Sequence, residues 1–145
     1  MTLTRRTLLS LFATSALWGA QLAAAQDLAS SPAPDGVSVR IIAPADGETV
    51  PGEFTVVFGL SGMGVAPAGV QQEGTGHHHL LVDGTELPPA NQPMGNPPIH
   101  FGGGQTETTL MLEPGEHTLQ LILGNHLHVP FEPSIVSEVV TVTVK

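Results

Sequence analysis

Proline and glycine interrupt this chain so often that few stretches could form a helix. The 145 residues include 13 prolines and 17 glycines, and no long segment shows the 3.6-residue apolar repeat of an amphipathic helix. Short runs of aliphatic and β-branched residues lie between these breaks, a pattern typical of strands joined by turns. The sequence therefore predicts an all-β fold.

Six segments carry the strand pattern. Their spacing predicts an immunoglobulin-like or fibronectin-type-III-like sandwich of about seven strands. The segments are 37–42, 54–60, 79–83, 107–112, 117–123 and 136–144.

The first 25 residues have the features of a cleaved export signal. Arg5 and Arg6 precede a short apolar stretch at 8–20, and small residues at 23–25 offer a cleavage site before Gln26. Segment 4–9 also resembles a twin-arginine signal, so the general secretory route and the export of folded protein both fit. Either route predicts a periplasmic or secreted protein.

The remainder of the chain is expected to be one domain. Residues 26–36 look like a flexible lead, and 37–145 are the predicted β-sandwich, long enough for a single core. No run after the signal approaches the ~20 apolar residues that a membrane-spanning helix needs.

Composition narrows the choice of partners. Cysteine is absent, which excludes disulfides and thiolate ligands, and without the signal only Arg40 and Lys145 are basic beside thirteen acidic residues. Nucleic acid is a poor partner for such a surface, because phosphates are neutralised by Lys and Arg. Cations or a basic partner surface are favoured.

Six of the seven histidines fall in three short segments, at 77–79, at 100, and at 126 and 128. Residues two apart on a strand share a face, so His77 pairs with His79, and His126 with His128, at about 6.6 Å between Cα atoms. His78 should then turn toward the core.

The predicted topology brings these segments together. If 54–60, 79–83, 107–112, 117–123 and 136–144 are strands B, C, E, F and G, the histidines occupy the B–C, D–E and F–G loops, which gather at one end of such sandwiches. His117 lies at the far end of strand F. There it resembles the aromatic residue of the E–F corner, which hydrogen-bonds to the corner backbone, and we expect a structural role.

Converging imidazoles without cysteine favour copper or zinc over calcium or magnesium. The expected ligands are His77, His79, His126 and His128, with His100 as a fifth candidate. Met63 and Met94 offer thioethers that would favour copper, and Glu73 and Glu107 could orient an imidazole.

Two other interpretations stay open. The histidines could form a hydrogen-bonded polar cap in a non-catalytic envelope module, with Asn125, Gln105 and Glu107 as partners. The same end could instead be a pH-sensitive contact for a periplasmic partner protein. Catalysis is less favoured than metal binding or delivery, because no serine lies in a nucleophile elbow and the glycines at 102–104 lead into a strand without a lysine.

The motifs GHHHLLVD (76–83) and HFGGGQTE (100–107), together with PGEHTL (114–119), resemble a family of small exported bacterial domains of unknown function. The resemblance covers about the last two-thirds of the chain. It implies a single exported β domain and carries no established activity, so the metal hypothesis rests on the residues themselves.

Overall fold

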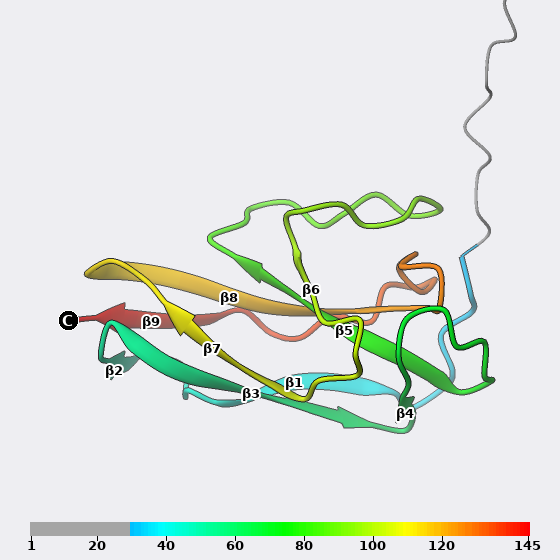
Figure 1. Cartoon of the computed structure of the whole chain (residues 1–145), viewed down its shortest axis with the longest axis horizontal. Coiled ribbons are helices and arrows are strands. Elements are labelled where there is room, and N and C mark those ends of the chain that lie inside the picture. Colours follow the sequence, from blue (N-terminus) through cyan, green and yellow to red (C-terminus); the bar gives the residue numbers. More distant parts are fainter. Residues whose placement is uncertain (1–29) are drawn as a thin grey trace, which may run out of the picture.

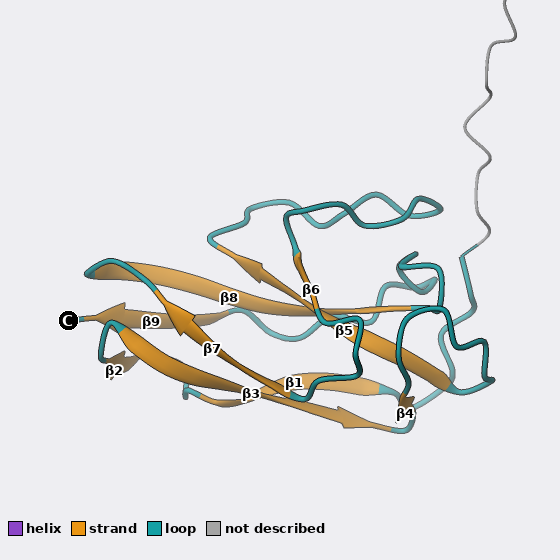
Figure 2. Cartoon of the chain, in the orientation of Figure 1, coloured by secondary structure: helices purple, strands orange, loops and turns teal. Residues whose placement is uncertain are grey.

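The computed structural model describes residues 30–145, so the predicted signal at 1–25 lies outside the described residues. Within the described part, nine strands and no helix form two sheets (Figures 1 and 2). The prediction of an all-β fold is confirmed. Among these residues no helix is long and apolar enough to cross a membrane.

The smaller sheet is antiparallel and has three strands. Its order is β1–β3–β7, formed by β1 (Ser38–Ala43), β3 (Glu53–Ser61) and β7 (Glu107–Met111). Along β3, Phe54, Val56 and Phe58 are buried. Because alternate residues of a strand share a face, this pattern directs one face of the sheet into the core.

The larger sheet has six strands and curls into a half-barrel. Its order is β2–β9–β8–β5–β4, with β6 paired to β5. β2 is parallel to β9 and β4 is parallel to β5, whereas the other pairs are antiparallel. The strands are β2 (Glu48–Val50), β4 (Gly64–Val65), β5 (Thr75–Val82), β6 (Ile99–His100), β8 (Gly115–Gly124) and β9 (Val140–Val144).

The core lies between the two sheets. Leu119, Leu121 and Leu123 of β8 are fully buried and belong to one hydrophobic cluster with Leu80 of β5 and Phe58 of β3. Burying a leucine side chain stabilises a fold by about 1.5–3 kcal/mol. This packing fixes which face of β5 and β8 points inward, and so which face is left for the histidines.

All six predicted segments contain a strand, and most boundaries agree within two residues, but two strands start four residues away from the predicted position. β5 begins at Thr75, four residues before the predicted start, so residues 77–79 lie inside a strand rather than in the preceding loop. β9 begins at Val140, and the expected strand residue Val136 makes only an isolated bridge to Ile122. The short strands β2, β4 and β6 were not predicted, because two or three residues among Gly and Pro carry no readable period.

Candidate metal centre

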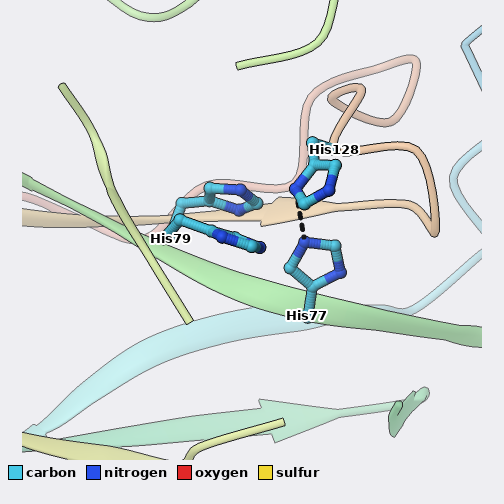
Figure 3. A group of neighbouring side chains, drawn as sticks. His77, His79 and His128 are labelled. Carbon is cyan, nitrogen blue, oxygen red and sulfur yellow. Dashed lines mark hydrogen bonds between the residues drawn. The ribbon is translucent and has the colours of Figure 1, made fainter. Parts of the chain in front are cut away.

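Four of the five expected histidine ligands lie together: His77, His79, His100 and His128. One ring nitrogen of each lies within 4.8 Å of one ring nitrogen of every other. Figure 3 shows His77, His79 and His128 pointing toward one another. His77 and His79 are fully buried, whereas His128 is partly exposed and His100 is exposed. The group is thus anchored inside the protein and open on one side.

Strand parity explains the two buried members. On β5, Leu80 points into the core between the sheets, so His77 and His79 point out of the opposite face of the larger sheet. His78 turns inward as predicted: its ring centroid lies 5.2 Å from that of Phe58, and its Nδ1 is 3.3 Å from the carbonyl oxygen of Gln105. The histidines do converge, but on the outer face of a sheet rather than at the end of the sandwich.

His100 reaches the group through strand pairing. In the two-residue strand β6, His100 pairs directly with His79, and their rings stack at 5.0 Å between centroids. A Cβ on Gly102 would lie 2.7 Å from Nε2 of His100, so the imidazole occupies space that only glycine leaves free. The backbone at Gly102 therefore lies directly against this ring.

His128 comes from a turn that follows β8. The buried side chain of Asn125 holds this turn, because its Oδ1 accepts hydrogen bonds from the amides of Leu127 (2.9 Å) and Val129 (3.1 Å). His128 has a φ of 65°. A non-glycine residue in the left-handed region costs roughly 1–3 kcal/mol and is often found at functional sites.

One pair of ring nitrogens has the spacing of metal ligands. Nε2 of His77 and Nδ1 of His128 are 3.4 Å apart (Figure 3), longer than the usual N–H hydrogen bond of about 2.7–3.2 Å. Two nitrogens bound tetrahedrally to one zinc ion at about 2.0–2.1 Å would be about 3.3–3.4 Å apart. The spacing of this pair fits such an ion, and the four ligand nitrogens of the group all lie within 4.8 Å of one another.

Burial keeps the inner histidines neutral. It lowers the pKa of His77 to about 4 and that of His79 to about 3, and repulsion from the other histidines of the group adds to both shifts. Burial also lowers the pKa of His128. Neutral imidazole is the form that binds a metal ion, so these side chains are ready to bind at neutral pH.

Several buried ring nitrogens have no hydrogen-bond partner among the described residues. They are Nδ1 of His77, Nε2 of His78 and both ring nitrogens of His79. Buried polar atoms are nearly always paired, and leaving one unpaired costs about 1–3 kcal/mol. Both ring nitrogens of His79, the most deeply buried member of the group, are among them.

The sequence of this site can be placed in a family. The model of a domain of unknown function, DUF4399, matches residues 56–145, which include every histidine of the chain. The chain belongs to the DUF4399 family. The resemblance noted from the motifs is confirmed, and the family name states no activity. No curated protein and no solved structure matches the chain.

Other expected residues of this DUF4399 domain lie elsewhere. His126 is outside the four-histidine group and lines a separate cavity of about 430 Å³ together with Met63 and Glu73. Glu107 is exposed at the start of β7 in the smaller sheet. Neither carboxylate orients a histidine of the group.

His117 has the structural role expected of it in the DUF4399 domain. Its Nε2 donates to the carbonyl oxygen of Glu113 (2.9 Å), which is the bond to the corner backbone, and its Nδ1 donates to Asp83 (2.8 Å). It lies near the start of β8, whereas the end of β8 pairs with His77. The seventh histidine is therefore separate from the group.

Two positioning residues of the DUF4399 site were not predicted in that role. Gly124 leaves room for His79, since a Cβ there would lie 2.8 Å from Cε1 of that ring. Asn125 bonds to the backbone of the turn rather than to a histidine. A glycine ending a strand and followed by asparagine is a signal for such a close approach and turn.

Proposed function

We propose that this protein binds one transition-metal ion, copper or zinc, for storage or delivery outside the cytoplasm. The observation that carries the proposal is His79, which is fully buried with both ring nitrogens unpartnered and faces three other imidazoles. A bound cation would satisfy one ring nitrogen of each histidine that binds it. Imidazole is a preferred ligand of both metals.

The polar cap is the weaker alternative. A cap would pair the ring nitrogens with one another and with Asn125, Gln105 and Glu107. Asn125 and the side chain of Gln105 instead bond to backbone amides, and the ring nitrogens of His77 and His128 are separated by 3.4 Å. A metal ion would pair one ring nitrogen of His79, which none of the expected cap partners does.

A binding or delivery role fits the accessibility of the group better than catalysis. His100 and His128 are on the solvent side, so an ion could enter and leave there. The export signal expected at 1–25 supports a periplasmic or secreted location. There an acidic protein without cysteine would bind copper or zinc through its histidines. A periplasmic partner protein is the natural recipient.

We also infer an immunoglobulin-like sandwich as the fold. β1, β3 and β7 share a sheet in the order of strands A, B and E, and β9, β8 and β5 share the other in the order G, F and C. That division of strands is the one found in immunoglobulin-like domains.

The test is native mass spectrometry of the untagged protein titrated with Zn²⁺, Cu²⁺ and Cu⁺. We expect one tightly held ion in the wild type and in His126→Ala, and its loss in His77→Ala/His128→Ala. Because His77 is buried and its replacement could perturb β5, His100→Ala provides a second variant at an exposed ligand. Circular dichroism of each variant establishes that it is folded.

Two results would overturn the proposal. One is the absence of stoichiometric binding by the folded wild-type protein, and the other is binding that survives in folded His77→Ala/His128→Ala. Loss of the ion in His126→Ala but not in His100→Ala would move the site to the neighbouring cavity and also contradict it.

A further inference from the structure

We propose that the thioether of Met94 joins histidines of the four-residue group as a ligand and makes the site selective for Cu⁺. This inference rests on the metal-binding function proposed above. Met94 comes from the segment between β5 and β6, which runs beside the larger sheet in Figure 1. Met94 therefore precedes His100 by six residues and comes from a different segment than His77, His79 and His128.

Two contacts place Met94 at the group. Its backbone amide donates a 2.8 Å hydrogen bond to the carbonyl oxygen of His128. Its Cε atom lies 2.7 Å from the point where a Cβ of Gly124 would stand, and Cε1 of His79 lies 2.8 Å from that same point. The methyl group of Met94 and the ring of His79 thus share the space that Gly124 leaves empty.

The burial of Met94 also distinguishes it from its neighbours. Residues 89–97 are exposed except for Met94, which is partly buried. The same side chain lines a cavity of about 360 Å³ formed by the segment that carries it. A methionine has three rotatable bonds, so it can turn its sulfur from this cavity toward the imidazoles without moving the backbone.

The chemistry of a thioether selects the metal. Soft sulfur ligands favour Cu⁺, whereas zinc in proteins is bound by thiolate, imidazole and carboxylate. The chain has no cysteine, so methionine is its source of soft ligands. A mixed set of imidazoles and one thioether binds Cu⁺ more favourably than imidazoles alone.

Met63 provides a matched control. It is the other thioether singled out by the sequence, but it packs against the hydrophobic core and lines the cavity that also contains His126. Replacement of either methionine by leucine conserves volume and apolar character, which usually costs less than about 1.5 kcal/mol. The two variants therefore differ mainly in whether a sulfur is lost at the histidines.

The experiment measures Cu⁺ affinity by anaerobic competition with a chromophoric Cu⁺ chelator, and Zn²⁺ affinity with a zinc indicator. We expect Met94→Leu to weaken Cu⁺ binding by about tenfold or more, the scale seen when groups around a metal site are lost. Zn²⁺ affinity should stay within about twofold, and Met63→Leu should match the wild type for both metals. X-ray absorption of the Cu⁺ complex should show a sulfur scatterer that disappears in Met94→Leu.

The failures of the two proposals are distinguishable. Cu⁺ affinity unchanged in Met94→Leu, an equal loss of Zn²⁺ affinity, or a Cu⁺ complex with nitrogen scatterers alone would overturn the role of Met94 and leave the histidine site standing. If the wild type binds neither metal, the histidine site itself is overturned.

Discussion

The Cα of Gly124 lies against the imidazole of His79, where a Cβ would stand 2.8 Å from Cε1 of the ring. Gly124 on β8 pairs with His77 on β5. Because glycine has no side chain, β8 leaves room at this position for the imidazole of His79. The site therefore depends on a residue that has no ligand atom.

Gly124→Ala should weaken metal binding by about tenfold or more, because the new methyl group displaces the ring of His79 and the side chain of Met94. Overpacking of this kind typically destabilises the fold by about 1–3 kcal/mol. Zinc titration and urea unfolding measure the two effects. Gly52→Ala is the control, since its Cβ would meet only the carbonyl oxygen of Leu112 at 3.7 Å; equal affinities in the two variants would contradict the prediction.

The metal-free protein should lose stability as the pH falls below about 6.5. The folded state holds the pKa of His77 at about 4 and that of His79 at about 3, whereas both have ordinary values near 6.5 when unfolded. At a pH between the folded and unfolded pKa values, the unfolded chain binds more protons than the folded protein does, so a fall in pH favours unfolding. We expect a loss on the order of 1–2 kcal/mol per histidine by pH 5.

Urea unfolding from pH 7.5 to 4.5 in the presence of a chelator measures this loss. The variant His77→Asn/His79→Gln should show a flatter profile, because its buried side chains do not titrate. A wild-type profile that is flat over this range would show that the two histidines are accessible to protons in the folded state.

Metal removal should lower thermal stability. An ion that binds only the folded state stabilises it by about 2.7 kcal/mol when free metal is a hundred times the dissociation constant. Differential scanning calorimetry with zinc, and then with excess chelator, should show a rise and a full return of the melting temperature. His126→Ala should behave like the wild type, and an identical melting temperature with and without zinc would argue against a site in the folded protein.

Asn125→Ala should impair the site through the turn that carries His128. The substitution removes the acceptor of two amide hydrogen bonds, to Leu127 and Val129, at a cost of about 1–3 kcal/mol. His128 then loses its position, and metal affinity falls. Asn125→Asp keeps an acceptor oxygen and should restore most of the affinity; if both variants bind zinc as the wild type does, the turn does not position His128.

His117 should affect stability and leave metal binding unchanged. Its hydrogen bonds to Asp83, and then to the carbonyl of Glu113, raise its pKa. Because the pKa of His117 is raised in the folded state, the stabilisation by these hydrogen bonds is fully present below pH 6.5. It is lost as the pH rises through the pKa of His117 in the folded protein. The stability difference between the wild type and His117→Gln should therefore be larger at pH 6 than at pH 9, with equal zinc affinities at pH 7.5.

Much of the fold could be predicted because strands and turns have recognisable local sequence patterns. The segments around Phe54, Leu121 and Val142 carry the apolar alternation of half-buried strands, and His117 was placed at a corner by its neighbours Pro114 and Gly115. The strand β6 could not be predicted, because pairing with β5 rather than any local preference makes residues 99–100 extended.

The candidate site could be predicted only in part for the same reason. The parity of His77 and His79 follows from the sequence, and so does the inward turn of His78. His126 and His128 have the same two-residue spacing, but they lie in a turn where strand parity does not apply, and the left-handed conformation of His128 separates them. The room that Gly124 leaves is filled by His79 and Met94, which come from distant segments of the chain. A local sequence pattern cannot predict such a contact.

The uneven anchoring of the four histidines bears on how quickly an ion could be exchanged. His77 and His79 lie on the eight-residue strand β5, whereas His100 lies on a two-residue strand and His128 on a turn. Short loop segments open far more often than a central strand unfolds. Two donors could thus detach while two stay in place, so the residence time of an ion would be set by loop opening, and a recipient could capture it one bond at a time without unfolding the sheet.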